Sequence, residues 1–179
     1  TAGVLDVKGA FVQLSTTSTA AFAPSTAHTT KLTGTTGQTV SFQSPTTSFF
    51  DSLVVDKGVG IPLPALQLAS DVQVTRGMVM QNSDSLVSAT TQKITIGRAL
   101  RIINSTTHPQ FRPFVAQLAQ APVIDSIFST VFSPDTTVYT SGMTLPTGSV
   151  MAYKSVRVSP ASGNVTFGSQ GANDTLKAS

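Results

Sequence analysis

The groups that could carry acid–base, nucleophilic or metal chemistry are few and widely spaced in this sequence. It contains two histidines, His28 and His108, no cysteine and no glutamate, and all eight of its acidic residues are aspartates. A metal site needs a cluster of His, Cys, Asp or Glu side chains, and neither histidine has an acidic residue within five positions. The sequence therefore predicts neither a metal site nor a bound cofactor.

Catalysis by paired carboxylates has one local candidate, Asp51 and Asp56. Glycosidases place two carboxylates on either side of one bond, but residues five positions apart on a strand point to opposite faces. The chain also lacks the Gly-x-Ser-x-Gly turn of a nucleophilic serine. Its Gly58-Val59-Gly60 segment lacks the third glycine and the Lys-Ser/Thr ending of a phosphate loop. We therefore expect a protein that is not an enzyme.

A weakly basic segment lies between residues 76 and 112, where a single acid, Asp84, accompanies five cations. The five are Arg76, Lys93, Arg98, Arg101 and Arg112. Tails that bind nucleic acid usually carry runs of like charge, and this segment has none. Two interpretations remain: scattered surface cations, or a face that makes weak, non-specific contacts with a polyanion such as packaged nucleic acid.

The elements that must position these residues are mostly strands. Apolar and polar residues alternate with a period of two, which is typical of half-buried strands. The clearest runs are 10–14, 40–42, 72–80, 94–96, 150–158 and 165–167, and segments rich in glycine and proline separate them. Many short strands with frequent turns favour a sandwich or barrel. The sequence thus predicts a single, mainly β domain over residues 1–179, folded as an antiparallel β-sandwich or barrel.

One region follows a helical period instead. Phe111, Phe114, Val115 and Leu118 fall at i, i+3, i+4 and i+7, and a second apolar stripe follows Pro122. This spacing predicts one or two short helices over about 113–131, at 113–121 and 123–131, broken or kinked at the proline. Such helices would cover an open end of the β core or contact another subunit.

From Ser15 to Thr47 the sequence is dominated by Ser, Thr, Ala and Gly, which is typical of edge strands and loops or of an extended arm. An arm of this kind gains its ordering energy from a neighbouring subunit. We therefore expect an extended N-terminal arm over 1–47. The expected subunit contacts are the apolar residues of this arm and of the helical region: Val4, Leu5, Val7, Phe11, Phe111, Phe114 and Leu118.

The composition favours a structural role. Ser and Thr make up 49 of the 179 residues, while charged residues make up only 11%. Burying a charge at a repeated interface is costly unless it is paired, whereas a hydroxyl can bond to backbone or water. These features predict a non-enzymatic, self-assembling subunit of a virus particle, either a capsid or shell protein or a tail-tube protein. The alternative is a secreted, pilus-like subunit of a cell-surface filament, assembled by strand donation.

The expected partners are copies of the chain itself in a large homo-oligomer, together with other proteins of the particle. No apolar run is long enough to span a membrane. The expected location is the virion, or the cell surface under the second hypothesis. Three glycosylation sequons, at Asn104, Asn164 and Asn173, carry little weight in a chain this rich in hydroxyl residues.

Overall fold

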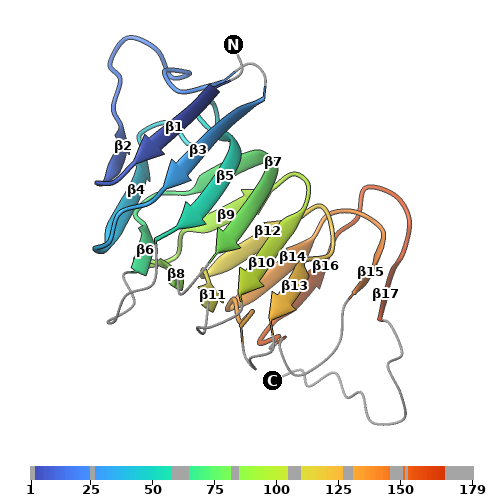
Figure 1. The fold of residues 1–179 in the computed structure, drawn as a ribbon. Coiled ribbons are helices and arrows are strands. Elements are labelled where there is room, and N and C mark those ends of the chain that lie inside the picture. Colours follow the sequence, from blue (N-terminus) through green and yellow to red (C-terminus); the bar gives the residue numbers. More distant parts are fainter. Residues whose placement is uncertain are drawn as a thin grey trace.

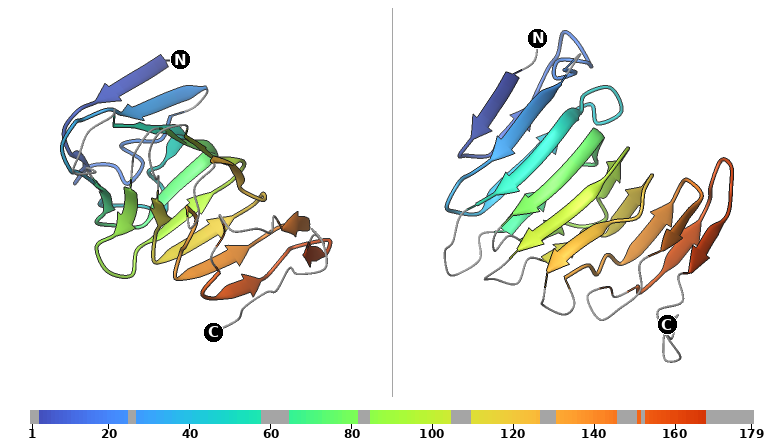
Figure 2. Two further views of the ribbon diagram at one scale, coloured as in Figure 1. Left: turned by 60° about the horizontal axis from the view of Figure 1, so that its bottom comes forward. Right: turned by 45° about the vertical axis from the view of Figure 1, so that its right-hand side comes forward.

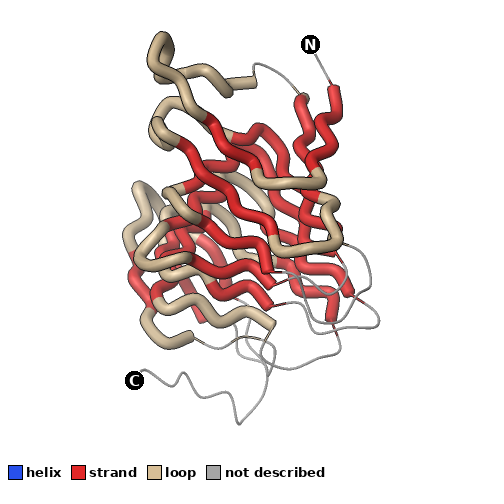
Figure 3. The backbone as a smooth tube through the Cα atoms, turned by 90° about the vertical axis from the view of Figure 1, so that its left-hand side faces the viewer, coloured by secondary structure: helices blue, strands red, loops and turns tan. Residues whose placement is uncertain are grey.

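The computed structural model describes residues 3–24, 27–57, 65–81, 85–104, 110–126, 131–145, 151 and 153–167. Over these residues the chain winds as a β-solenoid of about six turns, and its strands stack along one axis from the N-terminal end toward the C-terminal end (Figure 1). Central turns contribute three strands each, as β9, β10 and β11 do before β12 returns to pair with β9. No helix occurs among the described residues (Figure 3).

The strands form three sheets. The largest contains β1 (Gly3–Val7), β3 (His28–Leu32), β5 (Phe50–Asp56), β7 (Val72–Gln81), β9 (Lys93–Ile96), β10 (Leu100–Asn104), β12 (Val115–Leu118), β13 (Val123–Ser126), β14 (Thr136–Tyr139) and β16 (Val156–Val158). The second contains β2 (Phe11–Gln13), β4 (Gln38–Phe42), β6 (Ala65–Leu68), β8 (Ser85–Ser88) and β11 (Gln110–Arg112), and the third β15 (Met143–Leu145) and β17 (Val165–Phe167). The largest sheet divides at β7, which pairs with both β9 and β10.

The expectation of an antiparallel sandwich or barrel is wrong, because the paired strands described are all parallel. Each strand pairs with strands of the neighbouring turns, so the strands of successive turns are stacked in register (Figure 2). The predicted turns that fall within the described residues are corners of a coil, not hairpins. Paired residues are separated in the sequence by about 19 to 29 residues. The shortest separation is that of Thr137 and Val156, and the longest is that of Phe11 and Val40. This variation hides any fixed sequence repeat.

Inward side chains of successive turns stack into columns that form the core. One column contains Leu5, Thr30, Leu53, Met78 and Leu100, and the next contains Val7, Leu32, Val55, Met80, Ile102 and Ile124. Most members of both columns are buried, whereas Leu5 at the N-terminal end is 36% exposed. The alternation seen in the sequence therefore separates the inside of the coil from its outside.

The predicted helices over 113–121 and 123–131 are also wrong. Residues 115–118 form β12 and residues 123–126 form β13, while 127–130 lie outside the described residues. Phe111 and Leu118 both point into the core, but they belong to strands on two different sides of the coil, and Pro113 lies at the corner between them. At this corner the alternation of inward and outward side chains shifts by one residue. The resulting spacing of apolar residues in the sequence resembles that of a helix.

The N-terminal region is not an extended arm, because residues 3–42 contain four strands that pair within the same chain. Four phenylalanines, Phe11, Phe22, Phe42 and Phe50, pack together at this end, with ring centroids 4.9–6.4 Å apart. The Phe49 N–H donates to the Phe22 carbonyl over 2.8 Å, which holds the loop between β2 and β3 on the coil. This segment therefore gains its order from its own chain.

The described residues contain no helix that is long and apolar enough to cross a membrane.

Candidate functional site

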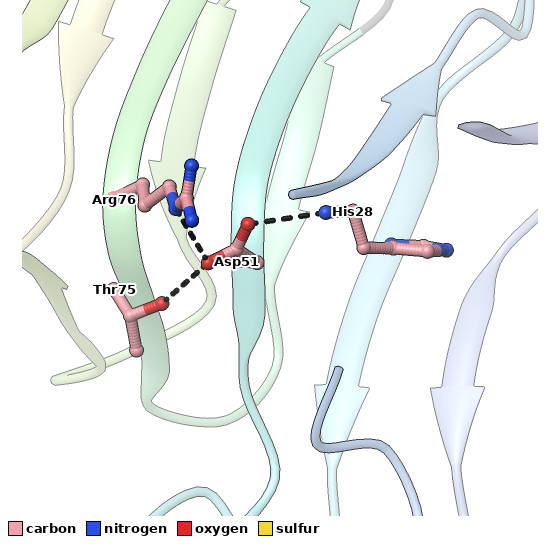
Figure 4. Close-up of polar contacts among 4 residues, drawn as sticks. All are labelled: His28, Asp51, Thr75 and Arg76. Carbon is pink, nitrogen blue, oxygen red and sulfur yellow. Dashed lines mark hydrogen bonds and ion pairs between the residues drawn. The ribbon is translucent and has the colours of Figure 1, made fainter. Parts of the chain in front are cut away.

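Asp51 is a buried acid near the start of β5, at a corner of the largest sheet, and its carboxylate has three polar contacts. Its carboxylate accepts hydrogen bonds from the backbone N–H of His28, over 3.1 Å, and from the Thr75 hydroxyl, over 3.3 Å. The same group lies 3.2 Å from Nε of Arg76 (Figure 4). These partners belong to β3 and β7, the strands on either side of β5, so Asp51 connects three turns.

The cluster follows from a β-bulge. Phe50 pairs with Val74 and Ser52 pairs with Gly77, so Asp51 alone faces both Thr75 and Arg76. A bulge leaves the extra residue without its normal ladder partner. Here the Asp51 carboxylate contacts the side chains of both Thr75 and Arg76. One turn later the corner has no room for a side chain: a Cβ on Gly97 would lie 2.5 Å from the Thr75 carbonyl. The cluster thus stabilises a bend in the coil.

Replacing Asp51 with alanine is expected to lower the free energy of unfolding by about 1–3 kcal/mol, because it leaves part-buried donors without an acceptor. The contribution of Arg76 is small, since its side chain is 47% exposed and solvent screens the ion pair. Urea unfolding followed by circular dichroism measures the change. Asp125→Ala, at an exposed position on β13, is the matched control. Equal midpoints for the two variants would contradict the role assigned to Asp51.

The five cations singled out in the sequence do not gather on one face. Arg76 and Arg98 lie at the same corner of successive turns. Lys93, Arg101 and Arg112 lie on three different strands, β9, β10 and β11, which occupy three sides of the coil. Asp51 and Asp56 lie near the two ends of β5, where Asp51 is buried and Asp56 is half-buried. His108 lies outside the described residues.

The described part of the chain offers few of the side-chain groups that would bind a small molecule or a metal ion. It contains no group of three or more His, Asp or Glu side chains that could hold a metal. A hollow of about 230 Å³ is lined by Pro45, Thr46, Asp71, Val72, Gln73, Lys93 and Thr95. One of its two ionisable side chains is already engaged, since the Asp71 carboxylate accepts from the Lys93 backbone N–H over 2.8 Å.

The first strand leaves an open edge at the N-terminal end of the coil. Among the described residues, β1 pairs only with β3, and residues 3–6 are exposed; Val4 is 66% exposed. The Val7 carbonyl accepts from Thr33 N–H over 3.0 Å, so Val7 turns its backbone groups toward β3. Because these groups alternate along a strand, Val4 and Asp6 present theirs to the open side. We call this outer side of β1 the N-terminal edge.

A buried polar cluster holds the N-terminal edge in place. The side-chain amide of Gln38 donates to the carbonyls of Val7, over 2.9 Å, and Gly9, over 2.7 Å. The same side chain accepts a hydrogen bond of 2.5 Å from the buried ammonium of Lys57. Gln38 therefore ties the end of β1 to β4.

The residues expected to contact other subunits fall into two groups. Val4 and Leu5 are exposed at the N-terminal edge, and Phe114 is 37% exposed at the corner before β12. Val7 and Phe11 are half-buried against the core, and Phe111 and Leu118 are fully buried within it. Sequence reasoning named Val4 and Leu5 but placed them on an extended arm, and it missed the bulge at Asp51, which joins residues that lie far apart in the sequence.

Comparison of the chain with models of protein families, with curated proteins and with solved structures finds no match.

Proposed function

We propose that this chain is a non-enzymatic structural subunit that assembles with copies of itself into an extended element of a virus particle. The observation that carries the proposal is the N-terminal edge, a five-residue parallel strand on which Val4 and Leu5 are exposed and whose outer side pairs with none of the described strands. Natural proteins usually protect such edges with charge, proline or a covering segment, because an open edge pairs with other strands. Asp6 is the one charge on this strand.

The exterior of the coil supports the same role. Hydroxyl side chains on neighbouring strands bond to one another, as Thr144 and Thr166 do over 3.1 Å. The cations are spread over several sides, which favours a position outside the particle, as in a spike or fibre, over one that faces packaged nucleic acid. A second candidate is a subunit of a cell-surface filament, which the open edge favours because parallel strand addition extends a coil in one direction.

Replacing Val4 with proline tests the proposal directly. Proline removes an N–H that faces the open side and leaves the bonds between β1 and β3 in place. The expected result is a loss of large assemblies by size-exclusion chromatography and negative-stain microscopy, with an unchanged circular dichroism spectrum. Val4→Thr keeps the N–H and serves as the control, which should assemble. Assemblies that form equally well with Val4→Pro would refute a role for the edge.

A further inference from the structure

The hollow on the outer face of the largest sheet is built from three turns of the coil. Gln73 on β7 and Thr95 on β9 lie opposite each other and form its floor. A tight turn at residues 44–48, closed by two backbone hydrogen bonds of 3.2 and 2.8 Å, precedes β5 and forms the wall through Pro45 and Thr46. The neighbours of the floor residues along each strand are buried, so the floor side chains point away from the core. The hollow therefore follows from the register of β7 and β9.

The polar groups around the hollow have free capacity for a ligand. The side chains of Gln73, Lys93, Thr95 and Gln117 are half-buried, and none of them forms a hydrogen bond within the described residues. Gln117 lies opposite Thr95 on β12, so Gln73, Thr95 and Gln117 form a row across three turns with a spacing of about 4.8 Å. The Asp71 carboxylate accepts from the Lys93 backbone N–H and keeps further lone pairs. The hollow and the row thus offer both donors and acceptors.

The size and the charge of the hollow indicate the class of ligand. Pockets that enclose a drug-sized molecule usually measure about 300–1,000 Å³. This hollow, of about 230 Å³, is smaller, and it has room for one ring of a longer molecule that continues along the row. The Asp71 carboxylate offsets the charge of the Lys93 ammonium, so the site carries little net charge and does not favour a polyanion.

A sugar chain matches these features. Each sugar hydroxyl both donates and accepts hydrogen bonds, as the amides and the hydroxyl of the row do. Successive rings of an extended chain would meet side chains on successive turns of the coil. Phe114 supplies an apolar surface nearby, because it is 37% exposed and directly precedes Val115, which pairs with Lys93. The C–H face of a sugar ring would cover this apolar surface and remove it from water.

We propose that the outer face of this coil binds a neutral oligosaccharide, with one ring in the hollow against Thr95 and the chain along the row of Gln73, Thr95 and Gln117. This binding activity goes beyond the proposed function, because it belongs to a single chain and does not require self-assembly. In an assembly of many copies, the repeated sites would strengthen attachment to a surface that carries several such sugar chains.

Replacing Thr95 with tyrosine tests the site by filling the hollow. Tyrosine suits an outward position on a strand, so Thr95→Tyr should keep the native circular dichroism spectrum. The wild-type protein is applied to an array of immobilised neutral and acidic oligosaccharides, and calorimetry then gives the dissociation constant for the neutral member that binds best. We expect binding to be at least about tenfold weaker for Thr95→Tyr, because the new ring clashes with the sugar. Gln73→Ala should weaken binding about threefold, because it loses one hydrogen bond.

Gln81→Tyr is the matched control. Gln81 is also a half-buried, outward residue of β7, but it pairs with Ile103 and does not line the hollow. This variant should bind the oligosaccharide as the wild type does. The inference would be overturned by binding to no neutral oligosaccharide, by equal binding of Thr95→Tyr and the wild type, or by loss of binding in Gln81→Tyr. In each case the proposed function would stand, because its test at Val4 measures assembly alone.

Discussion

Replacing Phe111 with alanine is expected to destabilise the coil by about 3–5 kcal/mol, the usual cost of removing a buried phenylalanine ring. Phe111 is fully buried, and its ring stacks on that of Phe132 with centroids 5.5 Å apart and an interplanar angle of 14°. A loss of this size is a large part of the total stability of a typical domain. The midpoint of urea unfolding, with its slope unchanged, measures it.

Phe114→Ala is the matched control, because Phe114 is three residues away and 37% exposed. We expect a change of about 1 kcal/mol or less at such a surface position. The comparison also separates the two interpretations of Phe111. If Phe111→Ala left stability unchanged but blocked assembly, Phe111 would be a subunit contact, as the sequence predicted, and the parallel coil would be incorrect.

Alkaline pH is expected to unfold the protein through its only two tyrosines. Burial raises the pKa of Tyr139 well above its ordinary value, and the neighbouring Tyr153, whose hydroxyl lies 3.0 Å away, adds to this increase. Burial also raises the pKa of Tyr153. Both groups therefore stay protonated in the folded coil at a pH where the unfolded chain has released their protons.

The sign of the pH dependence follows from this difference in bound protons. The stability that the tyrosines contribute is complete below about pH 10, the pKa of unfolded tyrosine, and is lost as the pH rises further. The loss amounts to at most about 1.4 kcal/mol per pH unit for each tyrosine. Tyr139→Phe should halve this part of the slope and move alkaline unfolding to higher pH.

Tyrosinate absorbance gives a direct measurement, because the chain has two tyrosines and no tryptophan. The wild-type signal should stay low above pH 10 and then rise together with the loss of the circular dichroism spectrum. Tyr153→Phe serves as the companion variant, since it removes the same hydroxyl contact from the other side. A smooth titration near pH 10 in a protein that keeps its native spectrum would contradict the buried pair.

Several strands could be predicted from the sequence, but β12 and β13, which were expected to be helical, and the arrangement of the strands could not. Val72, Val74, Met78 and Met80 alternate with polar residues, and all four are buried on β7. The same alternation arises in antiparallel and parallel sheets, so it carries no information about the direction of the partner strand. The coil is evident only from the pairing of residues in successive turns, such as Ile94 with Ala116.

The N-terminal edge could be predicted only in part, for the same reason. Val4 and Leu5 were predicted as subunit contacts because they are apolar residues in a segment of low charge. Whether β1 forms an open edge depends on which strands lie beside it, and no local pattern of residues in the sequence indicates this. Phe111 and Leu118 were assigned to the surface because a corner of the coil imitates a helical stripe.

The most direct test of self-assembly is the molar mass of the wild-type protein by light scattering over a range of concentrations. The account predicts masses that rise with concentration far above the 18.6 kDa of one chain, and rod-like particles in the same samples. A mass of one chain at every concentration, for a protein with a native β spectrum, would contradict it.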